Sequence, residues 1–574
     1  MRSVPLASSR LFDFRLPIAK CQLPNYRPIG IDNRNDRAVI TMLTSTRLIV
    51  FALILFIFVS LPQVAIAAPD SPKTQTPVFE RVVHVTAPSG NDSRYMYVPF
   101  DVPSHAVRIK VSYQYDRANG ANTIDIGLFD ARSTGSDTDP RGFRGWSGGR
   151  RSEFFVSRDE ATPGYMRGAM PAGKWHIILG LYKVAPAGVD ISFKVDIETK
   201  DNKSQSLSGA SRKPALVNTA DVVAAGAGNR TSLSTSAKHL AGGSRARWWS
   251  GDLHMHTVHS DGNWTIAELI SSARDNGLDF IVITDHNTAS HHEEIDRLSK
   301  GLRQPLVLRG EEITTYGGHT NAWGLPAGTW IDFRTRPGDS SRIAQIAAQA
   351  HRAGALISIN HPFVLCGGCS WSYDAAARGF DSIEVWNGPW DFTDEPALKM
   401  WDKILQSGRR ITAIASSDSH RPDTPIGKPT THVAASDLTQ PAILKAIRMG
   451  HVYLSDGSAR VELSFEGELA HGTSRARAMI GDQLRLLAPG KVRFLITTRA
   501  APANATVSLI SNGGLVRSFP ANTDGKPQVI EIDCQRDAYF RLEVRDGTKS
   551  MLALTNPIYV KIANRSKQWA GGEQ

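Results

Sequence analysis

The middle of this 574-residue chain carries the hydrophobic pattern that restricts its fold most. From about residue 247 to 455, short apolar runs of strand length alternate with stretches of helical periodicity. Strands that alternate with helices predict a parallel sheet or barrel, whose functional site lies at the carboxyl ends of the strands. We therefore expect an α/β domain over 247–455. The expected buried strands are 280–283, 306–308, 355–359, 382–385 and 411–415.

One helix of this segment is well marked in the sequence. Thr265 and Glu268 have the spacing of a capping box at a helix start. Gly277 is placed to end the helix. The apolar residues that share one face are Ile266, Leu269, Ile270 and Ala273.

The segments on either side alternate between apolar and polar residues. The run 107–115 shows this period of two within 78–200, and similar runs recur over 456–562. Strict alternation turns one apolar face inward, as in antiparallel sheets. We predict an N-terminal β-sandwich over 78–200 and a small C-terminal β-domain over 456–562. Residues 201–246 are rich in Ser, Ala, Gly and Asn and predict a flexible linker.

Residues 1–67 have the layout of an upstream segment followed by a signal peptide. The apolar run 48–61 follows Arg47 and precedes Ala65-Ile66-Ala67, a small-x-small cleavage pattern. Its fourteen residues are short for a membrane-spanning helix, which needs ~20. We expect export to the periplasm or the exterior, with no transmembrane span after cleavage. The alternative is a protein anchored in the membrane by an uncleaved signal.

Taken alone, the formal net charge of +11 would suggest a nucleic-acid or membrane partner. Much of this charge is misleading, however. Residues 1–67 hold eight Lys/Arg against three Asp/Glu, and the remaining excess is spread without a long basic run. No groove of basic and aromatic residues is visible either. The sequence therefore gives no strong nucleic-acid signal.

The four cysteines indicate a local crosslink. Cys21 would leave with the signal, and Cys366 and Cys369 are three residues apart. In an oxidising compartment we expect these two to form a disulfide, with Cys534 left over. A zinc ribbon would need a second such pair, and the chain has none.

Twelve of the seventeen histidines lie between His254 and His451. Several of them, with three acidic residues, fall at the ends of predicted strands. Residues i and i+2 of a strand point the same way, so His254 and His256 can reach one point at the end of the first strand. Imidazoles and carboxylates from several strand ends suit Zn, Mn or Fe. The residues concerned are His254, His256, His286, Glu311, Glu312, His319, His361, Asp418 and His420.

These residues stand in motifs that resemble the PHP (polymerase and histidinol phosphatase) family. The motifs, in chain order, are HxHxxxxDG, TDH, GxE followed by GH, NHP and DxH. The resemblance covers 247–455 and leaves the flanking segments out. The stretches GEEITT, GHTNAWG and EVWNG are similar to the carbaryl-hydrolase-like branch of metallohydrolases.

The resemblance implies a distorted (β/α)7 barrel that carries two or three divalent metal ions. It implies that the first metal binds His254, His256, Glu312 and Asp418. A second would share Glu312 and bind His319 and His361. The third would bind Asp261, His286 and His420. Glu312 occupies the GxE position, whereas Glu311 is one residue out and would face away.

Such a cluster of ions binds a bridging hydroxide and clamps the attacking and leaving oxygens of a displacement. This hydroxide would be the nucleophile, and no side chain is assigned as acid or base. We expect hydrolysis of phosphomonoesters or small phosphodiesters. The same hydroxide could attack a carboxylic ester or a carbamate. Candidates for substrate contacts are His259, Arg309, Arg421 and Lys428.

Two other interpretations remain open. The chain could be an exonuclease, or a surface binding protein in which the barrel is inert and the β-domains act. Complete ligand motifs argue against an inert barrel. The β-domains would either bind carbohydrate or shield the barrel.

Overall fold

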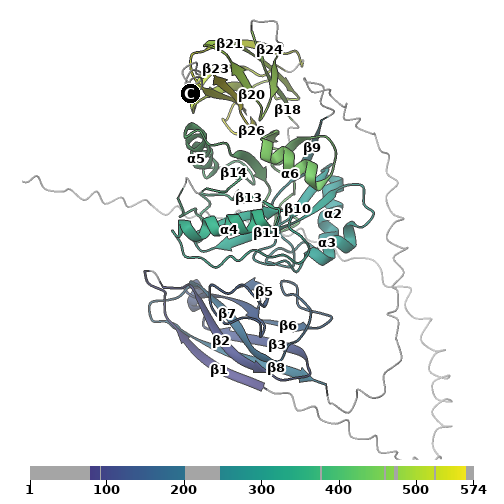
Figure 1. The fold of residues 1–574 in the computed structure, drawn as a ribbon, viewed down its shortest axis with the longest axis vertical. Coiled ribbons are helices and arrows are strands. Elements are labelled where there is room, and N and C mark those ends of the chain that lie inside the picture. Colours follow the sequence, from purple (N-terminus) through teal and green to yellow (C-terminus); the bar gives the residue numbers. More distant parts are fainter. Residues whose placement is uncertain are drawn as a thin grey trace, which may run out of the picture. The chain divides into compact units, whose positions relative to one another are not determined.

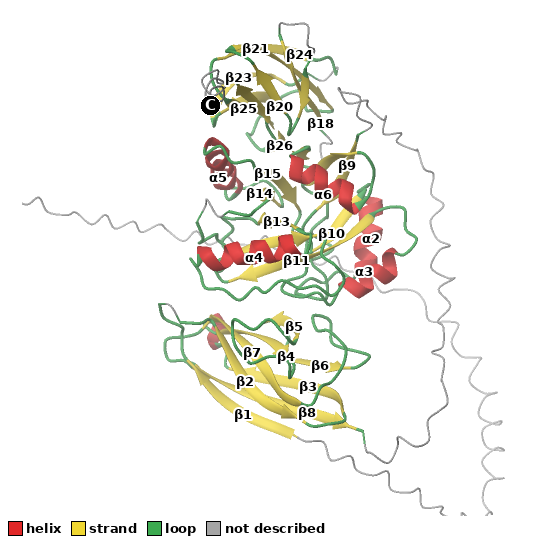
Figure 2. Cartoon of the chain, viewed as in Figure 1, coloured by secondary structure: helices red, strands yellow, loops and turns green. Residues whose placement is uncertain are grey.

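The computed structural model describes residues 78–90, 92–200, 246–374, 378–457, 461–470, 476–522 and 525–563. Over these residues the fold is mixed α/β and rich in strands (Figure 2). The α-helices all lie between Ile266 and Met449, and the N-terminal segment has one short 3₁₀ helix, Ala118–Gly120. The predicted signal peptide and residues 201–245 of the predicted linker lie outside the described residues. In the part of the chain that is described, no helix is both long and apolar enough to cross a membrane.

The N-terminal segment forms two four-stranded antiparallel sheets around one core. Its strands are β1 (Val78–Val85), β2 (Tyr95–Val102), β3 (Ala106–Tyr115), β4 (Thr123–Phe129), β5 (Phe143–Gly148), β6 (Glu153–Ser157), β7 (Gly173–Lys183) and β8 (Val189–Thr199). They are ordered β1-β8-β3-β6 and β2-β7-β4-β5. Ile109 and Val111 from one sheet and Ile124 and Ile177 from the other are buried in the same cluster. Alternating side chains thus face inward from both sheets, as the period of two predicts.

Seven strands of the central segment lie side by side (Figure 1). They are β9 (Arg247–Asp252), β10 (Phe280–Ile283), β11 (Leu306–Thr315), β12 (Gly318–Trp323), β13 (Leu356–Ile359), β14 (Ser382–Asn387) and β15 (Thr412–Ser416). The pairs β9/β10, β10/β11, β13/β14 and β14/β15 are parallel. Strand β12 is antiparallel to β11 and to β13. The regular alternation of strand and helix that we expected therefore breaks here, because the turn at 316–317 leaves no room for a helix.

Five helices pack against these strands. They are α2 (Ile266–Asp275), α3 (His292–Ser299), α4 (Ser340–Arg352), α5 (Asp394–Gln406) and α6 (Gln440–Met449). Helix α3 contacts β11, α4 contacts β13 and α5 contacts β14. The predicted capping box is confirmed, since Thr265 and Glu268 each accept a hydrogen bond from the other's backbone N–H. The predicted apolar face of α2 is buried, and Gly277 has a positive φ just after the helix.

The two outer strands of the seven also approach each other. Met255, just after β9, forms a parallel bridge with Ser419, just after β15. The backbone N–H of Asp418 donates to the carbonyl oxygen of His254 at 3.0 Å, and that of His256 donates to Ser419 at 3.0 Å. The ends of β9 and β15 are therefore adjacent. Closure of all seven strands into a distorted (β/α)7 barrel stays a prediction.

The sheet continues from the central segment into the C-terminal one. Strand β16 (Thr430–Ala435) pairs with β9 and with β17 (Val452–Ser455), and β17 pairs with β26. The C-terminal strands are β18 (Glu462–Leu469), β19 (Arg477–Met479), β20 (Gln483–Leu486), β21 (Gly490–Arg499), β22 (Thr506–Ser511), β23 (Gly514–Pro520), β24 (Gln528–Cys534), β25 (Ala538–Arg545), β26 (Met551–Thr555) and β27 (Ile558–Ile562). The predicted border at 455/456 is thus not a break in backbone pairing.

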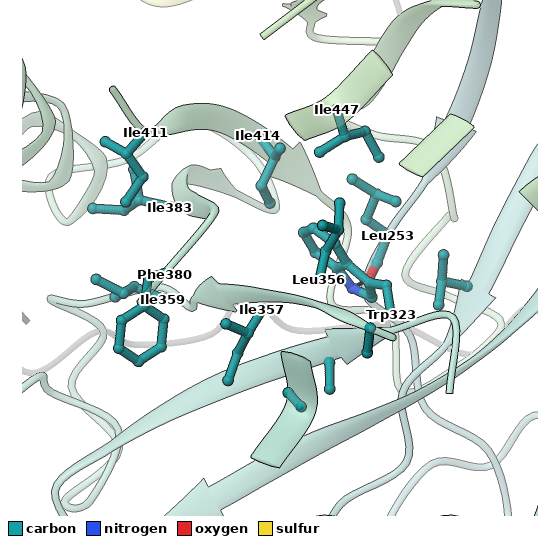
Figure 3. Close-up of a cluster of buried hydrophobic side chains, with 14 of the residues drawn as sticks. Leu253, Trp323, Leu356, Ile357, Ile359, Phe380, Ile383, Ile411, Ile414 and Ile447 are labelled. Carbon is teal, nitrogen blue, oxygen red and sulfur yellow. Dashed lines mark hydrogen bonds between the residues drawn. The ribbon is translucent and has the colours of Figure 1, made fainter. Parts of the chain in front are cut away.

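A cluster of buried apolar side chains lies beneath the central strands (Figure 3). Ile357, Ile383 and Ile414 come from β13, β14 and β15 and are fully buried. Burial of each such side chain stabilises the fold by about 1.5–3 kcal/mol. The indole N–H of Trp323 donates to the carbonyl oxygen of Leu253 at 3.0 Å. This core fixes the strands whose ends carry the predicted metal ligands.

Candidate metal centre

Glu312 lies at the middle of the candidate metal centre. Its side chain is 1% exposed and projects from β11. One carboxylate oxygen, Oε2, lies 2.9–3.4 Å from nitrogens of three imidazoles, and Oε1 lies 3.2 Å from nitrogens of two more. These five rings belong to His254, His256, His286, His319 and His361.

The first predicted ligand group converges closely. The Nε2 atoms of His254 and His256 lie 3.2 and 3.4 Å from Glu312 Oε2. They lie 3.3 and 3.0 Å from Asp418 Oδ1. Ligands ~2.0–2.1 Å from a tetrahedral zinc ion are ~3.3 Å from one another. The four side chains are therefore spaced like the ligands of one ion.

The second predicted group shares the carboxylate of Glu312 with the first. Glu312 Oε1 lies 3.2 Å from His319 Nδ1 and 3.2 Å from His361 Nε2. Asp418 Oδ2 lies 4.0 Å from His361 Nε2. Since Glu312 presents its other oxygen to the first group, it could serve two ions, and Asp418, which was predicted for the first group alone, lies near enough to His361 to contribute as well.

The third predicted group is the most open one. Asp261 Oδ1 lies 3.3 Å from His420 Nε2 and 3.5 Å from His286 Nε2. The side chain of Asp261 is 46% exposed, whereas those of the first two groups are mostly buried. One nitrogen of His256 lies within 4.8 Å of these ligand atoms, so this group adjoins the first.

The backbone around these residues departs from the expected strand ends. Strand β9 ends at Asp252, so the expectation that His254 and His256 end the strand is wrong. The reason is local, because Asp252 Oδ1 accepts hydrogen bonds from the backbone N–H groups of His254 and Ser417. These bonds replace regular strand pairing. Asp418 has a φ of 51°, a left-handed conformation that turns the chain just after β15.

Two buried atoms of the centre test whether it suits a cation. Nε2 of His254 and Oε2 of Glu312 lie 3.2 Å apart, but neither atom makes a hydrogen bond of good geometry among the described residues. Buried polar atoms almost always have a partner, and an unpartnered carboxylate oxygen is costly. A divalent ion between these atoms would satisfy both. The residues present therefore fit divalent metal ions.

The charges at the centre are strongly coupled. Burial lowers the pKa of His254, but the carboxylates of Asp418 and Glu312 outweigh it and raise that pKa well above its ordinary value. Burial raises the pKa of Glu312, yet the imidazoles, led by His254, hold it well below the usual range. Burial and the rings of neighbours such as His420 lower the pKa of His256 to about 4. At neutral pH, His256 thus offers a neutral ring nitrogen and Glu312 an ionised carboxylate.

Glu384 supports the ligands, a role that its place in the sequence did not predict. In the sequence it stands in the predicted buried strand 382–385 and opens the stretch EVWNG. Its Oε1 lies 3.3 Å from His254 Nδ1, and its Oε2 accepts a hydrogen bond from the backbone N–H of His361 at 2.9 Å. A carboxylate on the far nitrogen of a ligand imidazole fixes the orientation of the ring. The available signal was a glutamate inside an otherwise apolar strand, which is rarely buried without a partner.

His256 is supported through a serine. Ser260 Oγ lies 3.4 Å from His256 Nδ1 and donates to Asp285 Oδ1 at 2.6 Å. Asp285 also accepts from the backbone N–H of Thr257 at 2.7 Å. Asp285 is fully buried and holds the loop that carries His256. This arrangement leaves Nε2 of His256 directed at the first ligand group.

A cavity of about 650 Å³ opens onto all three ligand groups. Eight of its lining residues come from the N-terminal segment, among them Asp125, Trp146, Arg150 and Tyr182. Tyr316, at the turn after β11, donates from its hydroxyl to Asp125 Oδ2 at 2.7 Å. Burial raises the pKa of Asp125 to about 7, although the Tyr316 hydrogen bond opposes this. The N-terminal segment thus forms one wall of the cavity, which the sequence did not reveal.

The predicted disulfide also lies in the wall of the cavity. Cys366 and Cys369 are bonded, and both line the cavity. The Tyr182 hydroxyl donates to the carbonyl oxygen of Cys366. Cys534 is a free, buried cysteine, as expected.

The predicted substrate contacts lie elsewhere. His259 Nε2 is 3.2 Å from Glu294 on α3, and Arg309 pairs with Asp296. Arg421 is exposed. Among the described lining residues of the cavity, none of the candidates His259, Arg309, Arg421 and Lys428 is present.

No protein-family profile and no curated protein matches the chain. Several solved structures are similar to it. A two-domain protein from Bacteroides vulgatus containing a predicted PHP-like metal-dependent phosphoesterase is 16% identical over 54% of this chain and 95% of its own, with a TM-score of 0.32. A proposed metal-dependent phosphoesterase from Bifidobacterium adolescentis is 21% identical over 31% of this chain and 90% of its own, with a TM-score of 0.24. An amidohydrolase from Chromobacterium violaceum is 17% identical over 31% of this chain and 89% of its own, with a TM-score of 0.23.

Proposed function

We propose that this chain is a metal-dependent hydrolase of phosphomonoesters or small phosphodiesters. The observation that carries the proposal is the buried Glu312 carboxylate surrounded by five imidazoles at one end of a cavity. Such a set of ligands without a cation would leave buried polar atoms unpartnered. The cavity volume of about 650 Å³ lies within the ~300–1,000 Å³ common for small-molecule sites.

Two or three divalent ions in this centre would supply Lewis acidity and a water molecule of lowered pKa. The chain's own residues would bind the ions and orient the ligands. Glu312 and Asp418 present both of their carboxylate oxygens and keep the first two groups together. Glu384 orients His254, and Ser260 orients His256. No side chain is assigned as a general acid or base.

A phosphoester is favoured over a neutral ester by charge. A centre that holds several divalent ions attracts anionic phosphate oxygens more strongly than it attracts a neutral carbonyl. The walls formed by Trp146, Tyr182 and Val364 would accept the organic part of either kind of substrate. Carboxylic esters and carbamates are therefore the second candidate class.

We also propose that the chain belongs to the PHP family, that its central strands close into a barrel and that the protein is exported. The motifs from His254 to His420 support membership of the PHP family, and the adjacency of β9 and β15 supports a distorted (β/α)7 barrel. The stretches GEEITT and EVWNG support a carbaryl-hydrolase-like branch. The apolar run 48–61 before Ala65-Ile66-Ala67 supports export.

Purified residues 68–574 test the activity directly. Metal content is measured first, by elemental mass spectrometry. p-Nitrophenyl phosphate, bis(p-nitrophenyl) phosphate and p-nitrophenyl acetate are then assayed with and without chelator. We expect two or three metal ions per chain and chelator-sensitive turnover of a phosphate ester. Turnover of the acetate alone would contradict the phosphoesterase assignment, and chelator-insensitive turnover would contradict the metal centre.

Expression of the full chain in a bacterium with a periplasm tests the location. We expect the protein in the periplasmic or external fraction, with a mature N-terminus at Ala68. Recovery from the membrane fraction with the apolar run intact would favour the uncleaved anchor.

A further inference from the structure

The cavity contains a cation that no motif of the central segment supplies. Among the described residues that line it, Arg150 is the only lysine or arginine. Arg150 belongs to the N-terminal segment and follows β5 through the turn at Gly148 and Gly149. The same cavity is lined by four carboxylates, those of Asp125, Asp261, Glu312 and Asp418.

The structure holds the guanidinium of Arg150 next to the third ligand group. Its Nη2 donates to Asn263 Oδ1 at 2.7 Å and to the carbonyl oxygen of Gly262 at 3.3 Å. Gly262 directly follows Asp261, and the backbone N–H of Asn263 donates to the carbonyl oxygen of His420 at 2.7 Å. Arg150 is thus anchored beside the two ligands, Asp261 and His420, that are most open to the cavity.

The anchoring leaves part of the guanidinium unused. Both side-chain hydrogen bonds of Arg150 come from Nη2, and among the described residues Nε and Nη1 have no acceptor. Arginine presents its N–H donors in a planar fork that matches two oxygens of a phosphate. An arginine placed this way gives an anion a second point of attachment away from the metal ligands.

We propose that Arg150 of the N-terminal segment binds the phosphate group of the substrate and makes the site selective for phosphoesters over neutral esters. This inference rests on the proposed function, because it assigns a substrate contact in the same cavity. It also gives the N-terminal segment a direct part in recognition, beyond shielding the centre.

Inorganic phosphate is the first probe, because its binding needs no turnover. Zn²⁺-loaded full chain is titrated with phosphate by calorimetry, for the wild type and for Arg150→Gln. A charge-assisted hydrogen bond of this kind predicts about 10–100-fold weaker binding in Arg150→Gln. Arg150→Lys keeps the charge without the fork and should recover part of the loss.

Arg167→Gln is the matched control. Arg167 also lies in the N-terminal segment and also contacts the central segment, through Nε to Glu293 Oε2 at 3.1 Å. It does not line the cavity in the part of the chain that is described. Arg167→Gln removes the same charge and a comparable contact between segments, so it should bind phosphate as the wild type does. Metal content and the midpoint of thermal unfolding are measured for both variants.

The kinetic test separates the two substrate classes. Arg150→Gln should lower kcat/KM for p-nitrophenyl phosphate about 10–100-fold and that for p-nitrophenyl acetate less than about 3-fold. Equal phosphate binding in the wild type and in Arg150→Gln overturns the inference, and so does a wild type that binds no phosphate. Arg150-dependent phosphate binding without any phosphoester turnover overturns the proposed function and keeps only the phosphate-binding role of Arg150. Phosphoester turnover that is unchanged in Arg150→Gln overturns the inference and keeps the proposed function.

Discussion

The two strand-rich flanks of the chain meet the central segment in different ways. The N-terminal flank docks through side chains. Arg334 of the central segment, for example, donates to the backbone oxygens of Ser136 and Asp139, and Trp146 packs 4.8 Å from Phe333, measured between ring centroids. The C-terminal flank continues the sheet by backbone pairing of β17 with β26. It adds a buried ion pair in which Arg541 donates to Asp402 at 2.7 Å.

Only one of the flanks reaches the cavity. Among the described residues, the N-terminal flank lines it with eight, whereas no lining residue lies beyond His420. Both flanks carry the same period-two pattern in the sequence. From this comparison we expect the N-terminal flank to contribute to substrate binding and the C-terminal flank to contribute to stability. Each of the following changes tests one side of that comparison.

The largest effect is expected where neither flank contributes. Glu312→Gln keeps the shape of the side chain but removes the negative charge that lies next to five imidazoles. We expect kcat/KM for p-nitrophenyl phosphate to fall at least about 1,000-fold, because bridging ligands and metal ions are lost together. Elemental analysis should show reduced metal content.

Glu311→Gln is the matched control for this change. Glu311 is the neighbouring buried glutamate, and its Oε2 accepts a hydrogen bond from the backbone N–H of Ile331. Burial raises the pKa of Glu311 well above its usual value, so the neutral amide should be tolerated. Equal losses in the two variants would show that Glu312 acts through folding alone.

The next largest effect concerns the C-terminal flank and stability. Arg541→Met leaves the buried carboxylate of Asp402 without its arginine, while Glu543 keeps its contact with Arg545. Removing one partner of a buried ion pair typically costs about 3–5 kcal/mol of the free energy of unfolding. Denaturant unfolding should show this loss, while kcat/KM of the folded variant should change less than about 3-fold. A large fall in kcat/KM with unchanged stability would reverse the assigned roles of the flanks.

A smaller effect is expected from support within the central segment. Glu384→Gln weakens the hold on His254 Nδ1 but keeps the hydrogen bond to the backbone of His361. Loss of such a positioning carboxylate typically lowers metal affinity about 10–100-fold. Competition with a chelating dye measures this affinity. The metal affinity of Glu384→Gln could be unchanged while Arg150→Gln binds phosphate more weakly. In that case the contact from the N-terminal flank matters more to the site than the contact between Glu384 and His254.

The comparison also shows what the sequence could predict. The nine candidate ligands were identified because their motifs have fixed local spacing, and the structure brings all nine together in three adjoining groups. Their binding of metal stays a prediction. The helix start at Thr265 was identified because a capping box depends on residues three apart.

What the sequence did not predict depends on distant contacts. Arg150 and Asp125 line the cavity because the N-terminal flank docks there, and alternation alone does not say which loop will face a neighbour. Strand β12 reverses direction after the two-residue turn at Tyr316 and Gly317, which an expectation of parallel strands overlooked. Glu384 opens the stretch EVWNG, but the local spacing of that stretch does not show that the carboxylate reaches His254 from another strand.

The smallest expected effect is a pH dependence that the N-terminal flank adds to the cavity. Burial raises the pKa of Asp125 to about 7 from an ordinary 3.8. The folded chain therefore binds a proton here that the unfolded chain releases, and this part of the stability is lost as pH rises from about 4 to 7. Asp125→Asn has no titrating group at this position, so its stability does not include this pH-dependent loss. Because Asp125 borders an open cavity, solvent screening reduces the effect, and we expect the variant to gain about 1–2 kcal/mol on the wild type between pH 5 and pH 8.

Paired denaturant unfolding curves of the wild type and Asp125→Asn, recorded with chelator at both pH values, measure this gain. Other titrating groups are common to both proteins and cancel in the difference. Tyr316→Phe removes the hydrogen bond that opposes the raised pKa of Asp125, so in that variant the loss of stability should extend to higher pH. Stability curves that stay parallel for the wild type and Asp125→Asn would mean that Asp125 is fully hydrated. The N-terminal flank would then not seal this side of the cavity, and its contribution to the site would be reduced to that of Arg150.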